Sequence, residues 1–405
     1  MNITERLKKY VQVFTTSDEN SDTFPSTARQ FDLAHILVDE LKELGLEDAK
    51  VDNYGYVTAH LASNVDKDLP TLGLLAHMDT SPAMNGEGVK PQVIHYEGGD
   101  IVLNKEKNIV LSDEDFPALK EVRGLDLMVS DGTTLLGADD KAGIAIIMDS
   151  LKTLIEKDLP HGPLAIGFTP DEEIGCGVDH FDVDAFGADV AFTLDGSRLG
   201  EVQYECFHAV SGKVSIQGVS VHPGSAKNQM INAISLGMEL DGMLPEQMRP
   251  QYTEGYEGFY HLDQFRGTVD EAEMVYILRD FDAEKVKNMG EIFQAAVDFL
   301  NRKYGQHITL TLEESYRNMR EKIEPHMDLI DLCVDVMKEE GIEPIVAPIR
   351  GGTDGSKLSW MGLPTPNLFT GGMNFHGPYE YIPIQHMEKG RDFLVTLIQT
   401  MAKRA

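Results

Sequence analysis

Basic residues are scarce in this chain of 405 residues. Lysine and arginine together number 35, against 67 aspartates and glutamates, and the formal net charge is −32. Nucleic acids and anionic membrane surfaces bind basic protein surfaces, so this balance argues against both as partners. Most of the acidic residues are expected to form a solvated surface. A minority remain as candidate ligands for a cation.

Cysteine and long apolar runs are also scarce. The three cysteines, Cys176, Cys206 and Cys333, are far apart and form no CxxC pair. They therefore predict no disulfide framework and fit a reducing compartment. The first 26 residues alternate charged and apolar side chains, without the apolar core of a signal peptide, and no later segment is long enough to predict a membrane helix. We expect a cytoplasmic protein with no membrane partner.

The pattern of strands and helices predicts two domains. Apolar strands at 71–80, 163–169 and 188–195 alternate with helical segments, which favours an α/β domain with a mixed, mainly parallel sheet. The region 81–130 between them is expected to be long and irregular. From residue 208 the pattern changes to strands and helices of a smaller α+β unit, and the α/β pattern resumes after residue 320. We therefore predict a catalytic domain at 1–207 and 321–405, with an inserted domain at 208–320.

Polar residues follow the apolar strands at five places. Their side chains are expected to meet at one edge of the sheet, because ligands gather at the carboxyl ends of parallel strands. The candidates are His77 in "AHMDT", Asp139 in "GADDKAG", Glu173 in "TPDEEIG", Asp195 in "TLDG" and His376 in "NFHGPYE".

Each of these motifs also has an ordinary structural interpretation when it is taken alone. Asp139 or its neighbour Asp140 could cap the helix that follows, and a lone histidine after a strand is often a hydrogen-bonded core residue. Together, however, two imidazoles and three carboxylates suit two divalent cations that share one carboxylate. Asp139 would then be neutralised between two dications. In the Glu172–Glu173 pair, one carboxylate could hold a cation while the other accepts a proton from water.

These motifs resemble those of the M20 family of co-catalytic metallopeptidases. The resemblance runs through the segments "LLAHMDTSP", "LLGADDKAGIA", "TPDEEIG", "TLDG", "GVSVHPGSAKNQMINA", "AEMVYILRDFD", "RGGTDGSKLSWMGLPTPNLFTGG" and "NFHGPYE", which span nearly the whole chain. It implies an aminopeptidase that uses two Zn²⁺ ions per subunit, with Co²⁺ or Mn²⁺ as possible substitutes, to release the N-terminal residue of tripeptides.

The resemblance also implies a role for each site residue. The metal ligands would be His77, Asp139, Glu173, Asp195 and His376, with Asp139 as the bridge. Glu172 would be the general base and Asp79 the residue that orients His77. The inserted domain would act as a lid and carry the contacts of a homodimer.

Three residues of the motifs outside the metal cluster are assigned to the substrate. His222, in "VHPGSAKN", would stabilise the developing oxyanion, unless it is an ordinary surface histidine. Arg350 and Arg279 suit a forked grip on the carboxylate of a short peptide. For Arg279, an ion pair with Asp280 or Asp282 is an open alternative. The competing functions are a same-family amidohydrolase that deacylates N-acyl amino acids and a non-catalytic binding protein with the same fold.

Overall fold

The computed structural model describes residues 1–404, and its chain divides into two compact units. Unit 1 comprises 1–204, 321–347 and 353–405, and unit 2 comprises 205–320 and 348–352. The short segment 348–352 differs from the domain boundaries expected from sequence. It joins unit 2 because Ile349 pairs with Cys206 and because Arg350 donates hydrogen bonds to the carbonyls of Gly255 and Glu257.

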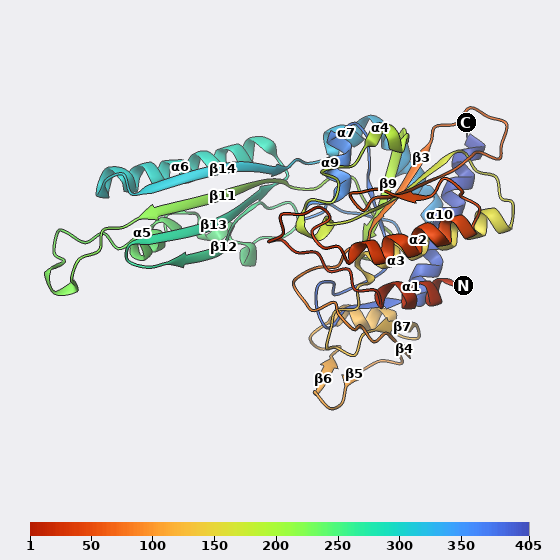
Figure 1. The fold of residues 1–405 in the computed structure, drawn as a ribbon, viewed down its shortest axis with the longest axis horizontal. Helices are drawn as coiled ribbons and strands as arrows, with labels where there is room; N and C mark the ends of the chain where they lie inside the picture. The colour runs from red at the N-terminus through yellow and green to blue at the C-terminus, as the bar shows by residue number, and fades with distance from the viewer. Residues whose placement is uncertain (405) are drawn as a thin grey trace. The chain divides into compact units, whose positions relative to one another are not determined.

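A mixed sheet of eight strands forms the centre of unit 1, in the order β1-β2-β8-β3-β9-β16-β10-β15. Figure 1 labels two of its strands, β3 and β9. These strands are β1 (Lys50–Val51), β2 (Val57–Leu61), β3 (Leu72–His77), β8 (Leu164–Thr169), β9 (Val190–Gly196), β10 (Glu201–Gln203), β15 (Ile345–Val346) and β16 (Asn367–Phe369). The neighbours β8, β3, β9 and β16 are parallel, and every residue of β3 and β8 is buried. Continuous apolar runs of this kind are typical of strands covered on both faces. The predicted α/β class is confirmed.

Helices cover this sheet. The helix α3 (Ala138–Glu156) packs on β3 and β9, and α1 (Ile3–Val11) and α10 (Ile384–Arg404) pack on α3. The helix α2 (Gln30–Glu43) contacts β1 and β2, α8 (Met327–Glu339) contacts β10, and α9 (Asp354–Trp360) contacts β9. The remaining helices of unit 1 are the short α4 (Val183–Phe186) and α7 (Arg320–Ile323), whose first residue belongs to unit 2.

Gly143 explains how closely α3 approaches the sheet. A Cβ atom on this residue would lie 2.1 Å from the carbonyl oxygen of Leu194 in β9. Only glycine allows a helix backbone to come so close to a strand. The start of α3, which carries Asp139, is thereby held against the strand that carries Asp195.

The region 81–130 is not irregular, contrary to the sequence-based expectation. It contains β4 (Gln92–His95), β5 (Ile101–Asn104), β6 (Ile109–Leu111) and β7 (Asp126–Val129), and β17 (Tyr381–Pro383) pairs with β7. These strands enclose a small core of their own, which includes Ile101, Leu111, Leu127 and Tyr381. The strands are only three or four residues long, and two glycine-containing turns interrupt the pattern, so alternation is hard to detect in the sequence.

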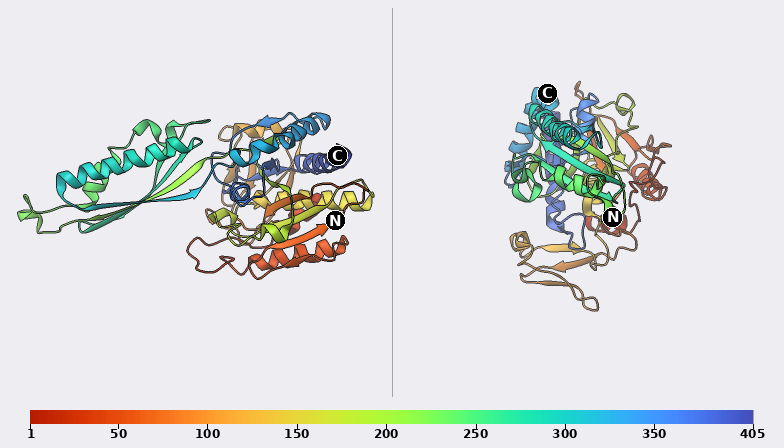
Figure 2. Two further views of the ribbon diagram at one scale, coloured as in Figure 1. Left: turned by 90° about the horizontal axis from the view of Figure 1, so that it is seen from above. Right: turned by 90° about the vertical axis from the view of Figure 1, so that its left-hand side faces the viewer.

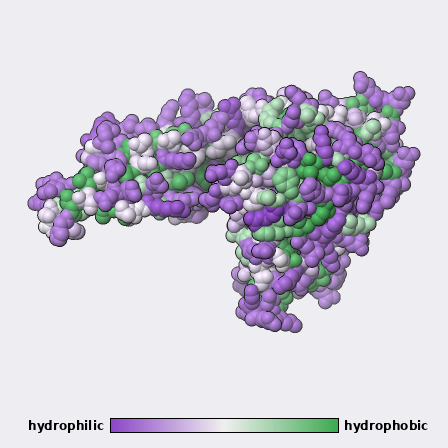
Figure 3. All heavy atoms as spheres, viewed as in Figure 1, coloured by the Kyte–Doolittle hydropathy of each residue, from purple (hydrophilic) through white to green (hydrophobic). Residues whose placement is uncertain are grey.

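Unit 2 is an α+β layer. Its sheet has the order β12-β13-β11-β14, formed by β11 (His208–Gln217), β12 (Phe259–Gly267), β13 (Glu271–Asp280) and β14 (Ile308–Tyr316). The helices α5 (Ala233–Asp241) and α6 (Ala283–Tyr304) share one core with the strands, and α6 lies along the sheet in Figure 2. Within residues 1–404, no helix combines the length and the apolarity needed to cross a membrane. Figure 3 shows a mostly hydrophilic face, as the acidic composition predicts.

Candidate metal centre

The structure brings five predicted ligands and Glu172 together at the carboxyl ends of the central strands. His77 is the last residue of β3, and Asp195 lies near the end of β9. Glu172 and Glu173 form a single 3₁₀ turn just after β8. Asp139 stands at the start of α3, and His376 follows β16 in a loop where its backbone is left-handed, with φ of 63°.

Asp139 lies between the two imidazoles. Its Oδ1 atom is 3.1 Å from Nε2 of His77, and its Oδ2 atom is 3.0 Å from Nε2 of His376. On the first side, Nε2 of His77 is also 3.6 Å from Oδ1 of Asp195. On the second side, Nε2 of His376 is 3.0 Å from Oε2 of Glu173. One carboxylate therefore offers a different oxygen to each of two nitrogen–carboxylate pairs.

Glu172 belongs to the same cluster. Its carboxylate, with His77 and Asp195, forms one of two groups whose ligand atoms all lie within 4.8 Å of one another, and His77, Asp139 and Glu173 form the other. The Oε2 atom of Glu172 is 4.0 Å from Nε2 of His77, the longest of the His77–carboxylate separations. A carboxylate at this position can accept a proton from a molecule held by the others.

Asp79 contacts three residues of the cluster: Glu172, Glu173 and His77. It is fully buried, and its two carboxylate oxygens accept hydrogen bonds from the backbone N–H groups of Glu172 (3.0 Å) and Glu173 (3.2 Å). Its Oδ1 atom also lies 3.3 Å from Nδ1 of His77, and its main-chain carbonyl oxygen lies 3.2 Å from the same nitrogen. A carboxylate on the far nitrogen of a ligating histidine fixes the ring orientation and the tautomer. Asp79 thus joins the β3 and β8 ends of the cluster.

Asp140, the neighbour of Asp139, makes hydrogen bonds of a different kind. Asp140 is fully buried, and its Oδ1 atom accepts a hydrogen bond from the N–H of Gly143, three residues further along α3. Its Oδ2 atom accepts one from the N–H of His77. The backbone at both aspartates is not helical, so the regular helix begins after them. Of the two adjacent acids, Asp140 caps the helix and Asp139 faces the histidines.

The electrostatics of the cluster show an excess of negative charge. Burial raises the pKa of Glu173 to about 7 and that of Asp195 to about 6, and the charge of Asp139 adds to both shifts. Burial and the charge of Asp195 also raise the pKa of Glu172. Burial alone would lower the pKa of His77, but the neighbouring carboxylates of Asp139, Asp195 and Asp79 outweigh burial and raise it. The two histidines of the cluster do not neutralise all of its carboxylates.

This donor set fits divalent cations. Imidazole nitrogens and carboxylate oxygens are suitable ligands for zinc, cobalt or manganese. The Oε1 atom of Glu173 is buried and has no hydrogen-bond partner among the described residues, as expected of an oxygen reserved for a cation.

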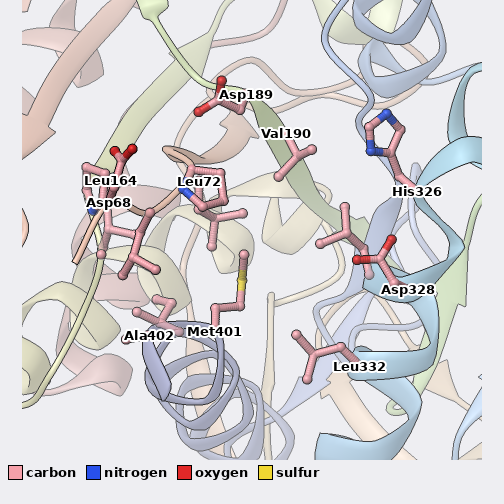
Figure 4. Close-up of a pocket in the computed structure, with 16 residues that line it drawn as sticks. Asp68, Leu72, Leu164, Asp189, Val190, His326, Asp328, Leu332, Met401 and Ala402 are labelled. Carbon is pink, nitrogen blue, oxygen red and sulfur yellow. The ribbon is translucent and has the colours of Figure 1, made fainter. Parts of the chain in front are cut away.

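The cluster is defined by its chemistry and not by the size of a cavity. A cavity of about 810 Å³ in unit 1 is lined by Leu72, Leu164 and Val190, the first residues of β3, β8 and β9 (Figure 4). It therefore lies at the opposite ends of these strands from His77 and Asp195.

The three residues assigned to the substrate all belong to unit 2. His222 is exposed, and its Nδ1 atom accepts a hydrogen bond from the N–H of Gly224. Arg350 stacks on Phe207 at 5.2 Å, and its Nη1 atom donates to the carbonyls of Gly255 and Glu257. These contacts give Arg350 a structural role within unit 2 that the sequence did not indicate.

Arg279 makes no ion pair with Asp280 or Asp282 in the part of the chain that the structure describes. Its guanidinium instead lies near the rings of Phe259 (5.9 Å) and Tyr316 (5.7 Å). Its Nε atom is buried, and within residues 1–404 it has no hydrogen-bond partner.

Two further buried carboxylates lie beside the cluster and were missed from the sequence. Asp354, at the start of α9, accepts a hydrogen bond from Thr169, the last residue of β8, and burial raises its pKa to about 7. Glu380 accepts a hydrogen bond from the backbone N–H of Asp139. Both stand in motifs that the sequence analysis quoted, "GGTDGS" and "NFHGPYE", but nothing in a single sequence distinguishes a buried acid from a solvated one.

Comparison with known proteins identifies the family. Residues 131–400 match the model of peptidase family M20/M25/M40, and the chain belongs to this family. The match includes every residue of the cluster except His77 and Asp79.

Relatives that align over the whole chain are more specific than the family match. The chain is 55% identical to peptidase T of Caldanaerobacter subterraneus, and the alignment covers 99% of both chains. It is 52% identical to peptidase T of Bacillus velezensis, with 100% and 99% covered. Among solved structures, it resembles a tripeptidase from Staphylococcus aureus (TM-score 0.80, 22% identity, 100% and 98% covered) and aminopeptidase PepT from Bacillus cereus (0.78, 21%, 99% and 98%).

Proposed function

We propose that this chain is a metal-dependent aminopeptidase that releases the N-terminal residue from tripeptides. The observation that carries the proposal is the position of Asp139, whose two oxygens face His77 and His376 at 3.1 and 3.0 Å. A carboxylate in this position can bridge two cations. The full-length similarity to proteins named peptidase T supports tripeptides as the substrate class.

Two Zn²⁺ ions would share Asp139, with His77 and Asp195 on one side and Glu173 and His376 on the other. When bound, such ions polarise a peptide carbonyl and lower the pKa of a water molecule to near neutrality. Cobalt or manganese would suit the same nitrogen and oxygen ligands.

Glu172 moves the proton in the proposed reaction. Its carboxylate accepts a proton from the attacking water, and the oxygen of that water forms a bond to the first peptide carbonyl carbon. The C–N bond then breaks, and Glu172 delivers the same proton to the leaving amine nitrogen. Asp79 keeps Glu172 in place through the backbone N–H bond and orients His77.

The residues of unit 2 are proposed to act on the substrate. His222 would donate a hydrogen bond to the tetrahedral oxyanion. Arg279, with its unpartnered buried Nε atom, would hold the peptide carboxylate. Arg350 would assist it with a guanidinium that also donates from Nη1 to the carbonyls of Gly255 and Glu257 and from Nη2 to Thr253.

The test is hydrolysis of unblocked di-, tri- and tetrapeptides beside an N-acetyl amino acid, with chelator and with added Zn²⁺. We expect metal-dependent release of the N-terminal residue, with tripeptides hydrolysed fastest. Cleavage of only the acetylated amino acid would instead establish the deacylase alternative. Metal binding without hydrolysis of any substrate would establish a non-catalytic protein.

We also propose a homodimer formed through unit 2 and a cytoplasmic location. The location is supported by the three cysteines, none of which forms a disulfide within residues 1–404. Light scattering of the intact chain and of a variant altered on the exposed face of α6, such as Phe299→Glu, tests the dimer. Phe299 is a suitable position because its side chain is 50% exposed.

A further inference from the structure

Glu380 is a buried carboxylate whose two oxygens are directed at backbone N–H groups. It is 1% exposed. Its Oε2 atom accepts hydrogen bonds from the N–H groups of Leu136 (2.7 Å) and Gly137 (2.8 Å), and its Oε1 atom accepts one from Asp139 (3.1 Å). Both oxygens are thereby used by the loop that leads into α3. Glu380 is therefore not placed as a cation ligand.

The same residue closes the base of the loop that carries His376. Met373 and Tyr381 exchange two backbone hydrogen bonds, of 2.9 and 3.1 Å, which close the segment 374–380 into a loop. Inside it, Nδ2 of Asn374 donates to the carbonyl of Tyr379 at 3.2 Å. Glu380 is the last residue of this loop, immediately before β17.

Two loops far apart in sequence are thus joined at two points. At the base, the carboxylate of Glu380 accepts hydrogen bonds from the backbone N–H groups of residues 136, 137 and 139. At the tip, Nε2 of His376 meets Oδ2 of Asp139. The pairing of β17 with β7 brings the two loops to the same place, because β7 leads into the first and β17 follows the second.

We propose that Glu380 is a positioning residue that sets the bridging carboxylate of Asp139 and the imidazole of His376 in register for metal binding. This inference rests on the proposed function. Its physical basis is that three converging N–H donors need an acceptor-only group, and a carboxylate satisfies all three. Glutamine has one oxygen, so its NH₂ group would face at least one of these N–H groups and displace that part of the loop.

The test compares Glu380→Gln with Glu40→Gln. Glu40 is also buried in unit 1 and accepts hydrogen bonds from Arg6, Lys9 and Tyr10, away from the cluster. Affinity for Zn²⁺ is measured by competition with a chromophoric chelator. Replacing a residue that supports metal ligands costs 10–100-fold in metal affinity, and this is the loss expected for Glu380→Gln. Glu40→Gln is expected to bind within twofold of the wild type.

A spectroscopic measurement separates positioning from simple destabilisation. At saturating Co²⁺, the visible absorption bands of Glu380→Gln should differ from the wild type, because the ligand geometry has changed, and those of Glu40→Gln should not. Fluorescence of Trp360 verifies that unit 1 is folded in each variant. Should Glu380→Gln fail to fold, Glu380→Asp keeps the charge with a shorter reach, and its affinity and spectrum are expected to change in the same direction.

The outcomes distinguish this inference from the proposed function. If the wild type binds two ions and hydrolyses tripeptides, but a folded Glu380 variant has unchanged affinity and spectrum, the positioning role is refuted alone. If the wild type binds no divalent ion, the proposed metal centre is refuted and the positioning role with it.

Discussion

The stability of the metal-free protein should fall as the pH rises, and Glu173 should account for a measurable part of the loss. Burial and the charge of Asp139 raise the pKa of Glu173 from 4.5 to about 7 in the folded state. A carboxyl group with a raised folded-state pKa contributes stability that is present below its unfolded pKa and is lost as the pH rises through the folded pKa. The loss for Glu173 therefore falls mainly between pH 5 and pH 7.

The magnitude follows from the two pKa values. At about 1.4 kcal/mol per pH unit, the free energy of unfolding should fall by roughly 2–3 kcal/mol between pH 5 and pH 8 through Glu173 alone. Asp195, with a pKa raised to about 6, changes stability in the same direction. The hydrogen bonds of His77 and His376 lower the pKa of Asp139, but that contribution is lost only when the pH falls below about 4.

The assay is urea unfolding in chelator at pH 5 and pH 8, followed by Trp360 fluorescence. Trp360 is the single tryptophan of the chain, and it ends α9 in unit 1, so the signal reports on the unit that contains the cluster. Glu173→Gln should lose roughly 2–3 kcal/mol less than the wild type over this interval. Glu47→Gln, at an exposed position of unit 1, serves as the control and should follow the wild type.

Saturating Zn²⁺ should reverse the trend in the wild type. Metal ions compete with protons for the ligands, so binding strengthens and stabilises the folded state more as the pH rises. An equal pH dependence in Glu173→Gln and the wild type without metal would refute the electrostatic reasoning.

Further predictions concern single residues. Glu172→Gln should lower kcat by about 10²–10⁴-fold while metal content by atomic emission stays at the wild-type level, and near-normal turnover would exclude it as the base. His376→Ala should lose bound metal, and its activity should fall as a result. An unchanged metal stoichiometry in dialysed protein would exclude His376 as a ligand. Asp79→Asn offers one N–H group a donor instead of an acceptor, so it should reduce kcat even with metal restored; unchanged kcat would contradict the orienting role. Gly143→Ala should destabilise unit 1 by about 1–3 kcal/mol in urea unfolding, because its Cβ meets the carbonyl of Leu194, and wild-type stability would show that α3 can shift.

The sequence predicted the central fold well where its signals are local. The apolar runs at 163–169 and 188–195 were predicted as strands. β8 lies within the first range, and β9 covers most of the second and ends one residue beyond it. The small strands of 81–130 were not detected, because their side chains pack on residues far along the chain, such as Tyr381. Alternation over three or four residues does not reveal such a core.

The candidate site, like the fold, was predicted from the sequence only in part. His77, Asp139, Glu173, Asp195 and His376 could be named in advance because each follows a strand or opens a helix, and parallel strands end at one edge. The local pattern alone did not decide between Asp139 and Asp140, since both are acids at one helix start, and only the resemblance to the family singled out Asp139. The structure separates them, because Oδ1 of Asp140 caps Gly143 while both oxygens of Asp139 face imidazoles.

The sequence by itself therefore determined the class of the fold and the chemical types that meet at its edge, because both follow from local patterns of apolar and polar residues. Only the tertiary structure decided which acids are buried, which of them support the ligands, and what Arg350 contacts. Burial and hydrogen-bond partners depend on residues hundreds of positions away: Glu380 reaches Asp139 across 241 residues, and no local pattern records that contact.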